Sequence, residues 1–237
     1  METLLKSKVL TEDAVIFQII DIDPDTADLE KIEQILLSYI DPAYSNIKKK
    51  ILFLEQILDS LWNILERVPF HQNIIFSCFI ETIHPIVTNK RDYEYVLDIL
   101  HSYLQTKFGS CAVFERFSKA MIELLEKSEV TTKEEEQRLI YTSMCFGLIL
   151  KFIHQSYEIN KMEHPDFDAT PFESLMRAVS QFLTQNTNER VRGYLFKSLF
   201  ETETVELGCN YLNEKELSVL LTQEGTFDLL GTYNYIL

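Results

Sequence analysis

Apolar and aromatic side chains recur at helical spacing through three successive segments between Tyr93 and Tyr157. In the first segment they are Tyr93, Val96, Leu100 and Tyr103, and steps of three or four residues place such side chains on one face of an α-helix. A segment of this kind buries its apolar face against neighbouring helices. The stretch therefore predicts a packed helical core, and it contains no constellation of catalytic residues.

Composition favours helices over strands in the rest of the chain. The chain has 237 residues, of which 46% are hydrophobic, and it contains only 6 Gly and 6 Pro. A β-sandwich or barrel needs turn residues about every eight to twelve positions, and so few glycines and prolines do not supply them. We expect long helices joined by short loops.

The spacing of apolar residues predicts about ten helices. Their expected ranges are about Glu12–Ile20, Asp28–Tyr39, Asn46–Arg67, Gln72–His84, Arg91–Lys107, Ser110–Leu125, Thr131–Tyr157, Thr170–Phe182, Asn188–Phe200 and Asn213–Leu221. The third is the most regular, because six apolar residues from Ile47 to Leu65 follow one another in steps of four and three. The apolar middle of Thr131–Tyr157 predicts a helix at the centre of the fold.

Capping signals mark two helix starts. Thr131-Thr132-Lys133-Glu134-Glu135 contains two overlapping capping boxes, and Thr170-Pro171-Phe172-Glu173 combines a cap residue, a proline and a glutamate. The longest polar loop is expected at Asn160–Ala169.

Single prolines and glycines predict three further features. Pro85 is expected to end or kink its helix, and Gly109 is a candidate helix stop. Gly147 lies inside an expected helix, where glycine costs about 1 kcal/mol relative to alanine. Close approach of a neighbouring helix would compensate for that cost.

Successive amphipathic helices without a strand signal are typical of an α-solenoid. We therefore expect a single helical-repeat domain over residues 1–237, of the armadillo or HEAT type. No fixed residue signature repeats along the chain, so any repetition is structural. A compact helical bundle is the alternative.

The charge of the chain argues against nucleic acid as a partner. The formal net charge is −15 and the isoelectric point is near 4.8, whereas nucleic-acid binders need a concentrated Lys and Arg surface. The basic clusters Lys48–Lys50 and Lys90–Arg91 are short and are interpreted as solvated surface. The acidic runs indicate solubility or, less strongly, a basic partner.

The cysteines and the N-terminus indicate a cytoplasmic protein. Cys78, Cys111, Cys145 and Cys209 are far apart and form no Cys-x-x-Cys pair, so we expect buried free thiols. Charged residues interrupt the N-terminal apolar run, and no window reaches the length of a membrane span. Direct insertion into a membrane is therefore not expected.

Three patterns resemble chemical sites without completing one. Asp21–Asp25 begins like a calcium loop, but Thr26 and Ile32 stand where glycine and glutamate are needed. Glu81-x-x-His84 and Asp98-x-x-His101 have di-iron spacing but lack the two further glutamates. No nucleophile or phosphate-loop motif occurs. We predict no catalytic, cofactor-binding or metal-binding residue.

The order of the apolar segments resembles that of a known family. The segments VLDILHSYLQTKFGSCAVFERF (96–117) and LIYTSMCFGLILKFIHQSYEI (139–159) are similar to the middle helical region of the dedicator-of-cytokinesis (DOCK) family. LEQILDSLWNIL (54–65) precedes them and ELSVLL (216–221) follows. The resemblance covers residues 50–221, whereas residues 1–45 and the tail 222–237 match poorly.

The resemblance implies a scaffold role. DOCK proteins activate Rho-family GTPases such as Rac, and their armadillo-like middle region separates a lipid-binding C2-like domain from the exchange domain. Residues 1–237 would then be a non-catalytic spacer that contacts the flanking modules of its parent chain. The GTPase and the membrane would be reached only through those modules, which this sequence lacks.

The alternatives are a stand-alone α-solenoid adaptor, which would bind a peptide or helix of another protein, and a metalloenzyme. A continuing reading frame on both sides would favour the spacer over the adaptor.

Overall fold

The computed structural model describes residues 12–127, 132–164, 166–185 and 188–199. These residues form eleven α-helices and two short 3-10 helices, and they contain no β-strand. The predicted all-helical class is confirmed. The expected helix at Asn213–Leu221 lies outside the described residues.

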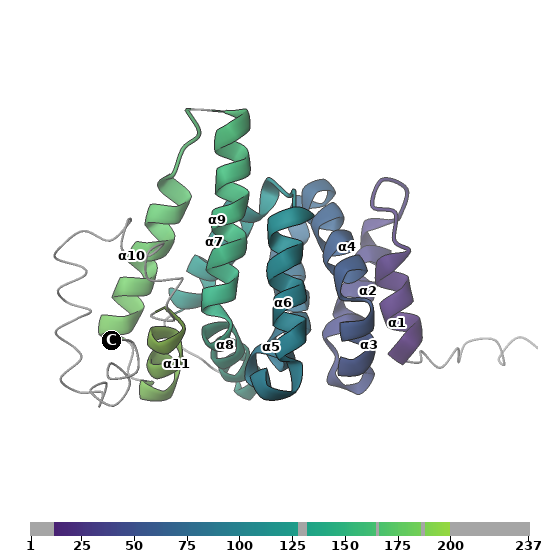
Figure 1. Ribbon diagram of the computed structural model, residues 1–237, viewed down its shortest axis with the longest axis horizontal. Helices are drawn as coiled ribbons and strands as arrows, with labels where there is room; N and C mark the ends of the chain where they lie inside the picture. Colours follow the sequence, from purple (N-terminus) through teal and green to yellow (C-terminus); the bar gives the residue numbers. More distant parts are fainter. Residues whose placement is uncertain (1–11, 128–131, 165, 186–187, 200–237) are drawn as a thin grey trace, which may run out of the picture.

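The helices follow one another along the longest axis of the molecule, from α1 at one end to α10 and α11 at the other (Figure 1). Their bounds are α1 Glu12–Ile20, α2 Leu29–Ile40, α3 Ile47–Leu52, α4 Leu54–Arg67, α5 Gln72–Thr88, α6 Lys90–Thr106, α7 Ala112–Leu125, α8 Lys133–Met144, α9 Phe146–Glu163, α10 Thr170–Gln185 and α11 Glu189–Leu199. The 3-10 helices are η1 Pro42–Tyr44 and η2 Pro69–His71.

The helix starts predicted from the two capping signals agree within one residue with those of α8 at Lys133 and α10 at Thr170. Side-chain caps are present at α2 and α8. The Asp28 carboxylate accepts a hydrogen bond from Glu30 N at the start of α2. At the start of α8, Thr132 Oγ1 accepts from Glu135 N at 3.1 Å and the Glu135 side chain accepts from Thr132 N. This confirms one predicted capping box, because both bonds involve residues only three positions apart.

The expected single helix Asn46–Arg67 is wrong, because it breaks at Phe53. This residue has φ −110° and ψ 23°, outside the helical region, and it separates α3 from α4. Its ring packs edge-on against Phe17 of α1 at a centroid distance of 5.2 Å. A regular apolar stripe continues through the break, so periodicity alone could not reveal it.

The expected helix Thr131–Tyr157 is also two helices. Cys145 lies at the junction with φ −93° and ψ 0°, and α9 begins at Phe146. The next residue, Gly147, donates its backbone N–H to Ser198 Oγ of α11 at 2.7 Å. The predicted close approach of another helix at Gly147 is thereby confirmed.

Helix α5 continues through Pro85 to Thr88, so the proline does not end the helix. Proline has no N–H, and the carbonyl oxygen of Glu81, four residues earlier, therefore loses its helical donor. Lys50 Nζ of α3 lies 3.4 Å from that oxygen and donates to it. A tertiary contact thus replaces the hydrogen bond that the proline removes.

Two other boundary predictions need correction. Helix α6 ends at Thr106, and Gly109 does not have a positive φ, so it is not a helix stop of the expected kind. Helix α9 extends to Glu163, which shortens the expected loop at Asn160–Ala169. Within this loop, Phe167 packs against Phe114 and Tyr157 at centroid distances of 5.2 and 6.1 Å.

The helices pack in two rows with a step of three. One row contains α1, α4, α7 and α10, and the other contains α2, α5, α8 and α11. The helices α3, α6 and α9 are the third members of successive groups of three helices. Of these, α9 packs mainly against α7, α11 and α8. Helix α5 contacts both rows and α6. Helix α9 buries Phe146 to Leu150, Phe152 and Ile153, so the apolar part of residues 131–157 also lies in the core, as predicted.

Aromatic rings join the rows in the core. Trp62 of α4 lies between Phe79, Phe108, Phe117 and Phe152, with centroid distances of 5.3 to 5.6 Å. Such offset and edge-to-face contacts contribute beyond the burial of their area. No helix in the described part of the chain is both long enough and apolar enough to span a bilayer.

Candidate functional site

The carboxylates of the calcium-like segment stabilise their own turn and a neighbouring helix. Asp23 accepts from Asp25 N at 3.1 Å and from Thr26 Oγ1 at 2.8 Å. Asp25 forms an ion pair of 3.0 Å with Arg67 of α4. These contacts give Asp23 and Asp25 partners within the protein.

The two carboxylate–histidine pairs also have other contacts. The His84 ring stacks on Tyr141 at a centroid distance of 3.5 Å, and burial lowers the pKa of His84 from 6.5 to about 4. His101 Nε2 lies 3.5 Å from Lys151 Nζ. Within the described ranges, no group of three or more His, Cys, Asp or Glu residues could hold a metal ion.

The cysteines within the described residues are free thiols, as expected, but the predicted burial holds for Cys78 and Cys145 and not for Cys111. Cys78 and Cys145 are fully buried, and burial raises their pKa values above the ordinary range. Cys111 is half-buried, and its pKa is raised by burial and by the nearby Glu163 carboxylate. A raised pKa keeps a thiol protonated, which disfavours nucleophilic chemistry. Cys209 lies outside the described residues.

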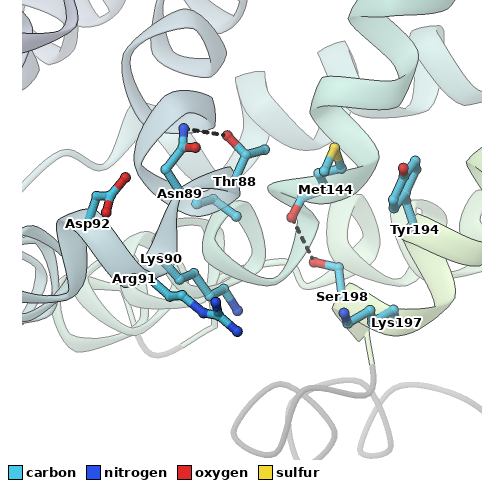
Figure 2. Close-up of a pocket in the computed structure, with 10 residues that line it drawn as sticks. Thr88, Asn89, Lys90, Arg91, Asp92, Met144, Tyr194, Lys197 and Ser198 are labelled. Carbon is cyan, nitrogen blue, oxygen red and sulfur yellow. Dashed lines mark hydrogen bonds between the residues drawn. The ribbon is translucent and has the colours of Figure 1, made fainter.

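Within the described residues, a pocket of about 490 Å³ could hold a ligand (Figure 2). It lies where the α5–α6 junction faces the end of α8 and the last turns of α11. Its lining is Val87, Thr88, Asn89, Lys90, Arg91, Asp92, Met144, Tyr194, Lys197 and Ser198. No residue of this pocket was predicted as a site residue.

The α5–α6 junction supplies one wall. Asn89 separates the two helices, and its side-chain amide donates to the Pro85 carbonyl oxygen at 2.9 Å and to Thr88 Oγ1 at 3.4 Å. Asn89 makes no side-chain cap to the start of α6, so the first turn of α6 faces the pocket without that cap. Lys90, Arg91 and Asp92 form this turn, and Tyr93, with φ −125° and ψ 25°, separates it from the rest of α6.

The end of α11 supplies the opposite wall. Ser198 is 5% exposed, accepts from Gly147 N at 2.7 Å and donates to the Met144 carbonyl oxygen at 3.5 Å. These bonds fix α11 to the α8–α9 junction and hold the adjacent Lys197 at the pocket. Figure 2 shows Lys90 and Arg91 extending toward this wall.

Among the described lining residues, three are cationic and one is acidic, in a chain of formal charge −15. Lys90 and Arg91 are exposed, in agreement with their interpretation as surface residues. The same interpretation is wrong for Lys50 of the other basic cluster, which is 2% exposed. Sequence reasoning missed the pocket because Lys197 is remote from Lys90 and Arg91 along the chain. The only signal available was the adjacency of Lys90 and Arg91, which does not distinguish a pocket from open surface.

Comparisons of this chain with protein-family models, curated proteins and solved structures found no match.

Proposed function

We propose that this chain is a non-catalytic helical spacer with armadillo-like packing. By its sequence resemblance, it is a segment of a DOCK-type exchange factor for Rho-family GTPases. In that role it would hold a lipid-binding module and an exchange module at a set separation, in the cytoplasm, and membrane recruitment would depend on the lipid-binding module. The resemblance at residues 96–117 and 139–159 is the basis for the family part of this proposal.

The proposed scaffold role is supported by the packing, in which the helices of both rows contact the helix three positions along the chain. The main contacts of every helix are with helices at most three positions away in the chain. Side-chain hydrogen bonds between helices have the same range, as in Tyr39–Thr82 and Tyr103–Asp59, which are 43 and 44 residues apart. Nearest-neighbour contact is the defining property of a solenoid, whereas a closed bundle also joins distant helices.

The step length gives partial support to an armadillo-like repeat. Equivalent helices of the first row begin at Glu12, Leu54, Ala112 and Thr170. The first step agrees with the roughly 40–47 residues of HEAT and armadillo repeats, and the later steps are longer. Three helices per step are also typical of the armadillo type.

Hydrogen exchange can test the solenoid. Leu195 of α11 and Leu36 of α2 are both 0% exposed, and Leu→Ala at such sites costs about 2–5 kcal/mol. We expect Leu195→Ala to accelerate amide exchange in α8–α11 and to leave α1 and α2 unchanged. Leu36→Ala is the matched control and should show the reverse pattern. Uniform acceleration by either variant would favour a closed bundle.

A nucleotide-release assay tests the spacer role. Rac loaded with a labelled nucleotide should release it at the spontaneous rate when this chain is added, because the exchange module is a separate domain of the resembled family. Acceleration by the chain alone would contradict the proposal. The coding frame should continue on both sides, with a C2-like segment before it and an exchange domain after it.

A stand-alone adaptor is the second candidate. Helix α6 exposes Tyr95 by 58% and Ile99 by 40%, and the two residues lie one turn apart. Such a pair can anchor an apolar segment of a partner. A stop codon directly after Leu237 would favour this function over the spacer.

A further inference from the structure

We infer that the exposed face of α6 binds a basic amphipathic helix of another protein. This face consists of an apolar stripe, Tyr95 and Ile99, beside an acidic stripe, Glu94 and Asp98. The inference rests on the adaptor function proposed above and names the chemistry of its partner. It depends on the exposure of the apolar stripe, the charge of the acidic stripe and the contacts that hold α6 in place.

The first argument is the position of the two stripes on the outer side of α6. Residues four apart lie one above the other on a helix, so each pair forms a row and the two rows are adjacent. Tyr95 is 58% exposed and Ile99 is 40% exposed. Figure 1 shows α6 on the near side of the molecule, with no helix of the described residues in front of it. The opposite side of α6 faces the core and buries Val96, Leu100, Tyr103 and Leu104.

The second argument is the charge of the acidic stripe. Glu94 and Asp98 are exposed, and neither forms an ion pair with another described residue. Like charges four residues apart destabilise a helix, and residues 92–106 contain no Lys or Arg. Lys151 approaches from α9, but it lies against His101 at 3.5 Å. Lys or Arg side chains of a partner would relieve the repulsion within this stripe.

The third argument is that α6 is held in place by its neighbours. It packs mainly on α5. The Tyr103 hydroxyl donates to the Asp59 carboxylate of α4 at 2.5 Å, and Lys107, directly after α6, forms an ion pair with Glu55 of the same helix. A side chain on a fixed helix loses less freedom when it binds a partner. Because tyrosine is among the residues that contribute most to binding at interfaces, Tyr95 is suited to be the central anchor.

The spacing of the stripes indicates that the partner is helical. Rows of side chains four residues apart on one helix pack into the grooves between such rows on another. A helix with Leu or Ile in one row would cover Tyr95 and Ile99, and Lys or Arg in the adjacent row would then face Glu94 and Asp98. The formal charge of −15 on the whole chain also favours the approach of a basic partner.

Isothermal titration of the full chain with a synthetic amphipathic helix made of Leu and Lys, at about 0.15 M salt, tests the inference. We expect saturable binding of one peptide per chain. Tyr95→Ser should weaken it about tenfold, because the tyrosine anchor is lost. Asp98→Asn should weaken it about twofold to fivefold, as expected for one surface ion pair. Both residues are exposed, so helicity measured by circular dichroism should not change.

Leu37→Ser and Glu173→Gln are the matched controls, because they remove an exposed apolar side chain from α2 and an exposed carboxylate from α10. Neither should change the affinity by more than about twofold, as expected for distant, independent sites. Absence of binding, or equal weakening by the controls, would overturn the inference. Equal affinity for a peptide with Glu in place of Lys would overturn the assignment to a basic partner. The reading-frame test of the adaptor function does not depend on this titration, so the failure of one is distinguishable from the failure of the other.

Discussion

The contact between Lys50 and the chain around Pro85 gives a prediction that can be worked out from the structure. Lys50 is 2% exposed, and its ammonium group lies 3.4 Å from the Glu81 carbonyl oxygen and 4.5 Å from the centre of the Tyr39 ring. Burial lowers its pKa. We infer that Lys50 is buried because it supplies the donor that Pro85 lacks.

This explanation predicts energetic coupling between Lys50→Met and Pro85→Ala. With Pro85 present, methionine at position 50 leaves the part-buried Glu81 carbonyl oxygen without a donor, at a cost of about 1–3 kcal/mol. In the Pro85→Ala background, the new backbone N–H at position 85 restores the helical bond, and the same substitution of Lys50 avoids that cost. The cost of desolvating the ammonium group is common to both backgrounds and cancels in the cycle. The expected coupling energy is therefore about 1–3 kcal/mol.

Chemical denaturation followed by far-ultraviolet circular dichroism would measure the free energy of unfolding of the four proteins in the cycle. Lys48→Met paired with Pro85→Ala is the control, because Lys48 is exposed on the same helix α3. The control pair should be additive within about 0.5 kcal/mol. If Lys50→Met and Pro85→Ala are equally additive, Lys50 does not replace the missing helical donor and the explanation is refuted.

Three further outcomes are expected. Ser156→Ala should destabilise the fold by about 1–3 kcal/mol, because Ser156 Oγ accepts a hydrogen bond from Phe114 N at 2.9 Å. Ser118→Ala should be neutral or stabilising, because Ser118 is equally buried and its hydroxyl makes no hydrogen bond within the described residues. Thermal unfolding of both variants checks this difference. His84 has a lowered pKa of about 4 in the folded state, so its contribution to stability is complete above the unfolded pKa of about 6.5 and is lost as the pH falls toward 4. The His84→Gln variant should therefore lose less stability than the original protein between pH 6.5 and pH 4. An identical pH profile of the two proteins in denaturation experiments would contradict this. Gly109→Ala should change the melting temperature by no more than a few degrees, because a Cβ there has no atom within 4 Å and φ is not positive; a large loss of stability would show that this glycine is needed.

Local interactions explain why so much of the helical structure was predictable. The apolar stripes of α2, α7 and α10 and the capping box at Thr132 depend on residues within one or two turns of each other. The spacing of side chains and the backbone dihedral preferences are set at this range. The all-helical class followed from the same information.

Helix breaks and continuity depended on distant residues. Phe53 interrupts a regular apolar stripe where its ring meets Phe17, and Cys145 interrupts another where Ser198 bonds to Gly147. Pro85 is accommodated because Lys50 approaches from α3. In each case a contact from another helix compensates for a local cost, so no short window of sequence contains the answer.

The sequence by itself determined that this chain is helical, which faces of its helices are apolar and that the common catalytic motifs are absent. Only the tertiary structure decided that the helices pack in rows with a step of three, and that Lys90 and Arg91 share a pocket with Lys197. The physical reason is the range of the forces involved. Hydrogen bonds and steric preferences along a helix act over a few residues. Helix packing and the clustering of charged side chains depend instead on which surfaces the fold brings together.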